Sequence, residues 1–280
     1  MIFFLLFPPV LLTVLSIVII AGIYIFLIMP RTKDPADMDM ISTNYAHRGL
    51  WDKSVPENSL PAFFYAAQNG YGIELDIQLS KDKQVMVFHD YSLKRMCGVD
   101  KKLSDLTCRE LKALSLSGTE FTIPTLSEVL ELVDGRVPLL IELKSGEWAT
   151  ALCEAVAPIL DKYRGAFGVE SFDPRLMSWF KKYRRRYARG QIVTKTKRCK
   201  KLHYTFVSFC LSKLFFNVIS RPDFIAVDIK RKKSLMIYVC KKLFHIPIFV
   251  WTVRAKEDIE SCKAEGYNLI FEKNDPTQRR

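Results

Sequence analysis

The stretch HRGLWDKSVPENSLPAF, residues 47–63, followed by GIELDIQLSKDKQVMVFHD, residues 72–90, combines reactive side chains with helix-like and strand-like patterns. It carries two histidines, an arginine and two alternating carboxylates within about one βα unit. A hydrophobic core does not need this combination, whereas a metal-assisted attack on a phosphodiester does. The two segments therefore bear on both the fold and the site.

Glu74 and Asp76 lie two residues apart in an apolar, β-prone run, so in a strand both side chains project from one face. If Asp82 and Lys83 form a two-residue turn to the next strand-like run, Asp76 lies directly opposite His89 and shares its sheet face. Because such turns prefer glycine where Lys83 stands, a longer loop that shifts this register stays open. The two-residue turn predicts that the acidic pair and the imidazole converge.

Two carboxylates on one inward face repel each other, and a hard divalent cation with oxygen ligands is the usual solution. Glu142, in an apolar run of another predicted strand, supplies a third carboxylate, with Lys144 on the same face. Glu74, Asp76 and Glu142 are therefore the predicted ligands of Mg²⁺ or Ca²⁺. The alternative is a buried ion pair between Glu142 and Lys144, which the neighbouring acidic pair makes the less favoured interpretation.

His47 closes a short predicted strand and is followed directly by Arg48 and Gly49. A lone histidine is more often structural than catalytic, but two of only four histidines flank the acidic pair, which favours catalysis. Arg48 offers a rigid fork of donors suited to phosphate oxygens, and Gly49 lets the backbone turn tightly beside it. His203 and His245 have no acidic neighbour, and we interpret both as structural.

The two segments resemble the signature of the glycerophosphodiester phosphodiesterase family, whose members cleave glycerol-headgroup phosphodiesters with a divalent cation. Matching pieces continue as LLIELKSG (residues 139–146), ESFDP (residues 170–174) and VWTV (residues 250–253). The resemblance therefore covers about residues 43–275. The His-Arg-Gly block and the Glu-x-Asp and His-Asp blocks are specific together, and each is weak alone.

The resemblance implies a role for each polar residue around the acidic pair. It makes His47 and His89 the acid and the base of the reaction, without deciding which is the base. A bound cation, Arg48 and Lys144 would neutralise the charge that develops on the phosphate. Trp251 ends an apolar run, where an aromatic side chain usually serves packing, and the resemblance places it in the glycerol pocket. The nucleophile, either water or the glycerol hydroxyl of the substrate, stays open.

The sequence departs from the family pattern at Leu50, at Ser59 and at FEKNDP (residues 271–276), which affects the pocket more than the chemistry. The leading expectation is a membrane-anchored enzyme that hydrolyses glycerophosphodiesters to sn-glycerol 3-phosphate and an alcohol. One alternative acts on lysophospholipids or phospholipid headgroups with the same site. The other is a non-catalytic lipid-binding barrel, which the presence of all the central polar residues disfavours.

Residues 2–29 contain no charged side chain, and at about 1.5 Å per residue this run exceeds the ~30 Å hydrocarbon core of a bilayer. No basic residue precedes the run, so a spanning helix is favoured over a cleaved signal peptide. Arg31 and Lys33 follow it, which favours a cytoplasmic catalytic domain. The seven cysteines, an odd number without motif spacing, fit a reducing compartment and give no zinc site.

The rest of the chain alternates between strand-like and helix-like patterns. Strands are predicted near residues 43–47, 72–79, 84–88, 138–144, 166–171, 190–194, 224–229, 247–252 and 268–271. Helices are predicted at residues 60–69, 147–162 and 256–265, and a small insertion at residues 91–125. This alternation predicts an α/β fold, a (β/α)8 TIM barrel with the site residues at the carboxyl ends of its strands. The expected domains are a transmembrane anchor at residues 1–30, a linker at 31–42 and the barrel at 43–280.

The chain is basic, with a formal net charge of +12 and a pI near 9.3. Residues 184–186 and 195–201 concentrate the positive charge. No nucleic-acid motif accompanies these clusters, so nucleic acid is not the expected partner. Beside a membrane anchor, an anionic lipid surface is the favoured partner, and a merely solvated face is the alternative.

Residues 202–219 are apolar nearly all round if they form a helix, with Lys213 as the only lysine or arginine. A second spanning helix is disfavoured, because it would put Glu74 and Trp251 on opposite sides of the membrane. The segment is therefore either an ordinary barrel helix with an apolar outer face or a helix that lies in the bilayer surface. In the second case the mouth of the site would face the membrane, because the segment follows a strand at the catalytic end.

Overall fold

The computed structural model describes residues 2–32, 38–146, 149–195 and 202–272, so the basic residues 196–201 and the end of FEKNDP lie outside the described residues. Eight parallel strands form a closed barrel, because β1 pairs with both β2 and β9. The barrel strands are β1 (Tyr45–His47), β2 (Gly72–Leu79), β4 (Leu139–Leu143), β5 (Phe167–Ser171), β6 (Ala188–Val193), β7 (Phe224–Asp228), β8 (Ile248–Val253) and β9 (Asn268–Phe271). The predicted TIM barrel is confirmed.

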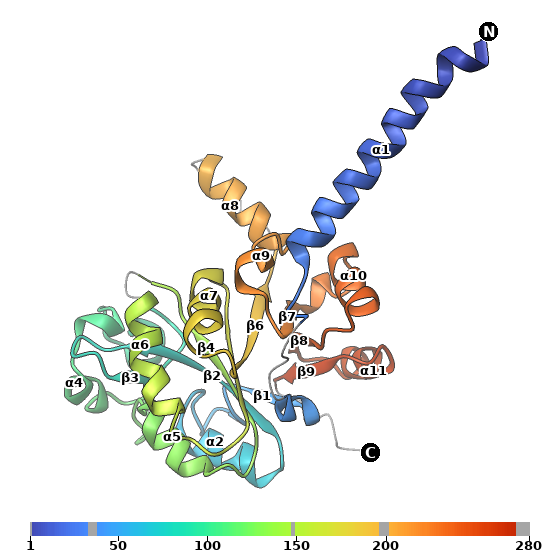
Figure 1. Ribbon diagram of the computed structural model, residues 1–280. Coiled ribbons are helices and arrows are strands. Elements are labelled where there is room, and N and C mark those ends of the chain that lie inside the picture. The colour runs from blue at the N-terminus through green and yellow to red at the C-terminus, as the bar shows by residue number, and fades with distance from the viewer. Residues whose placement is uncertain (1, 33–37, 147–148, 196–201, 273–280) are drawn as a thin grey trace.

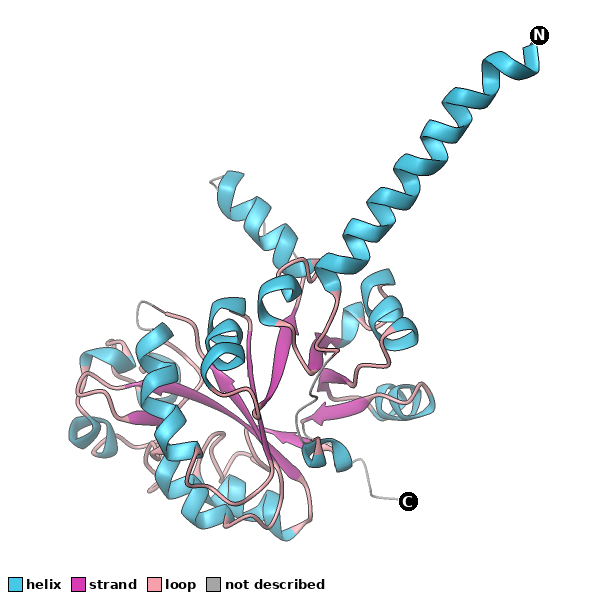
Figure 2. Ribbon diagram, viewed as in Figure 1, coloured by secondary structure: helices cyan, strands magenta, loops and turns pink. Residues whose placement is uncertain are grey.

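Helices surround this barrel, and one long helix projects from it (Figures 1 and 2). The helices are α1 (Ile2–Ile28), α2 (Leu60–Gln68), α3 (Lys94–Cys97), α4 (Cys108–Lys112), α5 (Leu126–Val133), α6 (Ala149–Leu160), α7 (Pro174–Tyr183), α8 (Leu202–Ser212), α9 (Asn217–Ser220), α10 (Leu235–Leu243) and α11 (Lys256–Ala264). Three short 3-10 helices are η1 (Asp39–Ser42), η2 (Leu103–Asp105) and η3 (Ile229–Arg231). In α2, the Ser59 side chain accepts a hydrogen bond from the Ala62 amide and caps the first turn.

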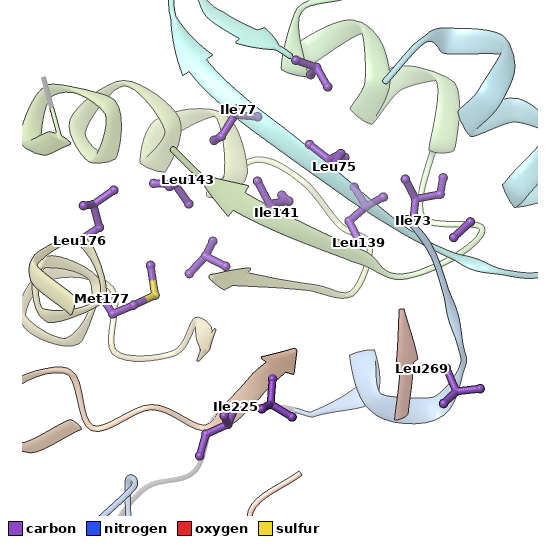
Figure 3. Close-up of a cluster of buried hydrophobic side chains, with 14 of the residues drawn as sticks. Ile73, Leu75, Ile77, Leu139, Ile141, Leu143, Leu176, Met177, Ile225 and Leu269 are labelled. Atoms are coloured by element: carbon purple, nitrogen blue, oxygen red, sulfur yellow. The ribbon is translucent and has the colours of Figure 1, made fainter. Parts of the chain in front are cut away.

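Alternate residues of the barrel strands face opposite sides. Ile73, Leu75 and Ile77 of β2 lie beside the matching apolar residues of β4 in the layer that packs under the helices (Figure 3). The residues between them point into the barrel, where the carboxylates of β2 lie. In β2 the polar positions therefore face the barrel interior.

The barrel interior is apolar near the amino ends of the strands and polar near the carboxyl ends. Its buried apolar cluster includes Tyr45, Leu140, Phe249 and Ile270. Two residues further along each of these strands, on the same face, come His47, Glu142, Trp251 and Glu272. The apolar side chains on the amino-end side of the barrel interior thus pack against the polar side chains at the carboxyl ends.

The predicted hairpin register is wrong by one residue. β3 (Val85–Val87) pairs antiparallel with β2 so that Ile77 lies opposite Val87, which puts Asp76 opposite Phe88 instead of His89. The loop has three residues, because the Ser80 amide donates to the Gln84 carbonyl at 3.0 Å and Lys83 adopts a left-handed φ of +62°. This loop type adds a residue to one strand and shifts the pairing.

His89 nevertheless reaches the site, because it lies beyond the end of β3. The Gln78 side-chain amide donates to the carbonyl oxygens of Phe88 at 2.8 Å, His89 at 3.2 Å and Asp90 at 2.9 Å. These bonds hold the segment against β2. The following insertion, predicted at residues 91–125, packs around a small apolar cluster of its own that includes Leu103 and Leu111.

The end of α1 is packed against the barrel. Ile28 is fully buried, and Arg31 forms an ion pair with Asp223 at 3.0 Å. Met40, in the predicted linker, is buried in the interior cluster. The segment Pro9–Ile28 is long and apolar enough to cross a membrane, by length and composition.

Gly49→Ala should destabilise the protein, because Gly49 has a φ of +84° and an added Cβ would lie 2.8 Å from backbone atoms of Ala62 in α2. Gly70→Ala is the matched control, because Gly70 has a φ of +71° but no atom within 4 Å of the added Cβ. The overpacking in Gly49→Ala should cost about 1–3 kcal/mol more, and its thermal unfolding midpoint should be lower by at least about 2 °C. Equal thermal unfolding midpoints for Gly49→Ala and Gly70→Ala in the full-length protein would show that residue 49 is not packed tightly against Ala62.

Candidate active site

A cavity of about 370 Å³ opens at the carboxyl ends of the strands. Its lining includes seven of the eight predicted site residues, namely His47, Arg48, Glu74, His89, Glu142, Lys144 and Trp251. The eighth, Asp76, lies among them with only 1% of its surface exposed. The structure therefore gathers all eight residues, from loops and strands far apart in sequence.

Three carboxylates from two neighbouring strands form an acidic cluster. Asp76 of β2 is the direct neighbour of Glu142 of β4, and Glu74 lies two residues before Asp76 on the same face. One oxygen of each carboxylate lies within 4.8 Å of the other two, and all three residues are buried. Their spacing fits oxygen ligands around one hard divalent cation.

The electrostatics of the cluster fit a cation as well. Burial raises the pKa of Glu74 well above its usual value, and the charges of Asp76 and Glu142 add to that effect. Burial likewise raises the pKa of Glu142 to about 7. Carboxyls that would otherwise hold protons become good ligands when a cation replaces those protons. The donor set suits Mg²⁺ or Ca²⁺, as the sequence predicts.

Lys144 contacts two of the three carboxylates. Its Nζ lies 2.7 Å from Asp76 Oδ1 and 2.6 Å from Glu142 Oε1. The ion pair that the sequence offered as an alternative is thus present, but it is one part of a larger acidic cluster. With 9% of its side chain exposed, Lys144 also reaches the cavity, where its charge can meet an anion.

Arg48 is held in the turn after β1 by three acidic residues. Its backbone amide donates to Glu74 Oε2 at 3.0 Å, and its Nη1 donates to Glu57 Oε1 at 2.6 Å. Its Nε lies 3.5 Å from Asp76 Oδ2. These contacts fix the guanidinium at the edge of the cavity, beside the acidic cluster.

His47 lies between two carboxylates. Its Nδ1 is 3.3 Å from Glu272 Oε2, and its Nε2 is 4.0 Å from Glu74 Oε2. Burial lowers the pKa of His47, although a hydrogen bond to the Glu272 carboxylate opposes this shift. Glu272 also binds Arg254 at 2.7 Å, so this carboxylate is itself fixed and can orient the imidazole.

His89 has a different acidic partner and is more exposed. Its Nδ1 lies 2.6 Å from Asp90 Oδ1, and 34% of its side chain is accessible. Burial lowers its pKa, and the nearby charge of Asp76 opposes that shift. Asp90 in turn binds Arg95 at 2.6 Å. Both histidines therefore present a supported imidazole to one cavity.

Trp251 packs edge to face against Phe172, with ring centroids 5.8 Å apart. Both aromatic rings line the cavity. They form an apolar wall beside the charged groups, as a pocket for a carbon skeleton requires.

Four residues that the sequence did not single out also shape the site. Asn58 donates from Nδ2 to Asp76 Oδ2 at 2.8 Å, and Glu57 and Glu272 orient Arg48 and His47. Glu170 lies next to Glu142 in the strand register, and its buried Oε2 has no hydrogen-bond partner among the described residues. Glu57, Asn58 and Glu170 lie inside motifs quoted above, which is the signal that could have identified them.

The profile of the glycerophosphoryl diester phosphodiesterase family matches residues 47–271. A glycerophosphodiester phosphodiesterase of Caldanaerobacter subterraneus subsp. tengcongensis is 31% identical over 244 residues, which cover 81% of this chain and 91% of that protein. The chain belongs to the glycerophosphoryl diester phosphodiesterase family. Members of this family are phosphoric diester hydrolases, so the cavity is the candidate active site of such a hydrolase.

Two further similarities concern the fold and the substrate class. The structure of an Oleispira antarctica phosphodiesterase in complex with sn-glycerol-3-phosphate has a TM-score of 0.67 and 22% identity, and the match covers 81% of this chain and 91% of that one. A lysophospholipase D of Rattus norvegicus is 33% identical over 137 residues, 44% of this chain and 42% of that protein. The first match shows the shared barrel fold.

Affinity for the divalent cation should rise with pH through about 7. Because the pKa values of Glu74 and Glu142 are raised, both carboxyls hold protons at lower pH, and the cation must displace them. Calorimetric titration of the full-length hydrolase at about pH 6 and about pH 8 should show tighter binding at the higher pH and more proton release at the lower one. Equal affinity at both values would contradict a site formed by these carboxylates.

Proposed function

We propose that this hydrolase is a membrane-anchored glycerophosphodiester phosphodiesterase that forms sn-glycerol 3-phosphate and an alcohol. The observation that carries the proposal is the meeting of three buried carboxylates with two supported histidines in one cavity. The carboxylates suit a divalent cation, and the histidines suit proton transfer. The curated relative with the same activity spans most of this chain.

Each part of the site has a distinct task in the proposed reaction. Glu74, Asp76 and Glu142 hold the cation, which when bound neutralises charge on the phosphoryl oxygens. Arg48 and Lys144 bind the remaining anionic oxygens and disperse the charge that develops during attack. Ion pairs with carboxylates keep the side chains of Arg48 and Lys144 in place before the substrate arrives.

The two histidines act as acid and base. One imidazole removes a proton from the nucleophile, and the other protonates the departing oxygen. Burial lowers the pKa of both His47 and His89, which favours the neutral imidazole that a base requires. Glu272 and Asp90 orient the two rings and stabilise their charged forms. If water is the nucleophile, sn-glycerol 3-phosphate forms directly. If the glycerol hydroxyl attacks, the alcohol leaves and a cyclic phosphate forms, which water then opens to sn-glycerol 3-phosphate with the same two histidines.

The anchor in this proposal is α1, followed by a catalytic domain in the cytoplasm. The support is the exposed apolar surface of α1 and the cationic residues that follow it. In cells, α1 should keep the protein in the membrane during carbonate extraction, and protease added outside should leave the barrel uncut. Digestion of the barrel in intact cells would reverse the proposed orientation.

A second candidate function is lysophospholipase D-like hydrolysis of membrane lipids. It is supported by the partial match to the rat lysophospholipase D and by the exposed apolar side chains of α8. The same polar residues would act, because a lysophospholipid carries the same glycerophosphodiester group.

A substrate panel separates the two candidates. Full-length protein with Mg²⁺ or Ca²⁺ would be given glycerophosphocholine, glycerophosphoglycerol and lysophosphatidylcholine at matched concentrations. Higher kcat/KM on the two soluble diesters supports the first function, and higher kcat/KM on the lysolipid supports the second. Failure to cleave any of the three would refute both.

A further inference from the structure

Helix α8 stands away from the barrel on the side from which α1 projects (Figures 1 and 2). Its residues, Leu202–Ser212, include no lysine, arginine, aspartate or glutamate. Phe206 is 63% exposed, Tyr204 56% and Phe209 41%. A barrel helix normally buries its apolar face, so this exposed aromatic surface calls for an apolar environment outside the barrel.

Contacts through the segment after α8 link α8 to α1. The ring of Tyr24 in α1 packs edge to face on Phe215 at 6.0 Å between centroids, and Phe215 packs in the same way on Phe209 of α8 at 6.1 Å. The Asn217 side chain donates to the carbonyl oxygen of Ile28 at 3.0 Å. The carboxyl ends of α1 and α8 are therefore packed together through Phe215 and Asn217.

Cationic side chains gather where the two helices meet. Arg221 donates to the carbonyl oxygens of Phe26 at 3.0 Å and Met29 at 2.9 Å. Lys213 lies 5.7 Å from the centroid of the Phe209 ring, and Lys181 donates to the Ile219 carbonyl oxygen at 2.8 Å. Lysine and arginine beside apolar segments mark the headgroup level of a bilayer, where their charge meets anionic phosphates.

We propose that α8 inserts into the same bilayer that α1 spans, as a second, shallow membrane helix. The inference rests on the proposed anchoring by α1 and names lipid acyl chains as the occupant of the exposed α8 surface. Eleven residues give a helix of about 16 Å, which is about half of the ~30 Å hydrocarbon core. The helix is therefore too short to cross and lies along the surface of one leaflet, with its aromatic side chains in the acyl chains.

The chain that leads into α8 leaves β6 beside the active-site cavity. The Arg231 guanidinium donates to the Thr194 carbonyl oxygen, and residues 228–230 just before it line the cavity. The eight peptide steps from Thr194 to Leu202 span at most about 29 Å, so the start of α8 lies within that distance of Thr194.

The test places a tryptophan in α8 of the full-length protein, reconstituted in phosphatidylcholine–phosphatidylglycerol bilayers with or without acyl-chain bromine. Phe206→Trp reports on α8, Ile19→Trp on α1, and Tyr65→Trp on α2. Ile19 and Tyr65 are 52% and 46% exposed, so the controls match the probe. The emission of the four native tryptophans is subtracted with wild-type protein. Each variant should retain wild-type hydrolysis of glycerophosphocholine.

Bromine should quench the added emission of Phe206→Trp and of Ile19→Trp, and should leave that of Tyr65→Trp unchanged. Quenching of Ile19→Trp alone would overturn the inference, and a blue-shifted but unquenched Phe206→Trp would place protein against α8 in the place of lipid. If Ile19→Trp also escapes quenching, the anchor and the inference both fail. Because quenching does not require turnover, a protein inactive on every diester could still confirm insertion while refuting the proposed function.

Discussion

Asparagine in place of His47 or of His89 should lower kcat on glycerophosphodiesters by about 10²–10⁴-fold, because each variant removes a proton-transfer group. Both imidazoles line the cavity, and each is oriented through Nδ1 by a carboxylate, Glu272 for His47 and Asp90 for His89. Neither ring belongs to the apolar clusters of the barrel, so the fold should survive. The measurement is steady-state release of the alcohol by each variant at saturating cation.

His245→Asn is the matched control for these variants. His245 is exposed and has a φ of +52°, a conformation that asparagine tolerates well. It should keep wild-type kcat and the wild-type unfolding midpoint. Near-normal kcat in either His47→Asn or His89→Asn would contradict the assignment of that histidine as acid or base. The side chain of His203 lies outside the described side chains and offers no such control.

Removal of divalent cations should lower activity by about 10²-fold or more, since charge stabilisation worth several kcal/mol is lost. Addition of Mg²⁺ or Ca²⁺ should restore it. Because the cation binds the folded state, a concentration of about 100 times its Kd should add about 2.7 kcal/mol to the free energy of unfolding. Activity and thermal unfolding of chelator-treated and reloaded protein check both effects.

Glu142→Gln tests whether the acidic cluster is the metal site. It should abolish the gain in stability on adding cation and the activity, while Glu131→Gln on the exposed face of α5 should behave as wild type. Full activity in protein shown to be free of metal would refute the site. If cation stabilises Glu142→Gln as much as wild-type protein, the metal site lies elsewhere.

The barrel could be predicted because its strands are apolar runs bounded by turn residues. The sequence predicts that β6 begins at residue 190. It begins two residues earlier, at Ala188, and includes Arg189. A charged residue argues against a buried strand when its partner is unknown. That partner is Asp223, 34 residues further along, whose carboxylate lies 3.7 Å from Arg189 Nη1 and accepts from the Arg189 amide at 3.1 Å.

The sequence could predict that the site residues lie close together. It could not predict the register that places His89 or the contact between Glu272 and His47. Glu74, Asp76 and Glu142 follow from strand periodicity, and the resemblance supplies the histidines. The predicted register of His89 is wrong because the loop before β3 has three residues, with a left-handed conformation at Lys83 and not at Asp82. Glu272 follows a strand about 225 residues from the His47 that it orients, and no local pattern links the two.

The structure that residues 202–219 adopt also depends on tertiary packing. The composition allowed either a barrel helix or a helix in the bilayer surface. The segment contains α8, which stands exposed, and α9, whose Asn217 and Ser220 are buried against the barrel and α1. Sequence periodicity could not separate the two parts, because both are short and neither contains a lysine, arginine, aspartate or glutamate.

The most direct test of the central claim identifies the bond that is broken. Purified full-length protein with Mg²⁺ or Ca²⁺ would be incubated with glycerophosphocholine and followed by ³¹P NMR. The predicted products are sn-glycerol 3-phosphate and choline, formed only with cation and not by Glu142→Gln. Phosphocholine and glycerol as products, or no hydrolysis by folded protein with its cation bound, would contradict the proposed activity.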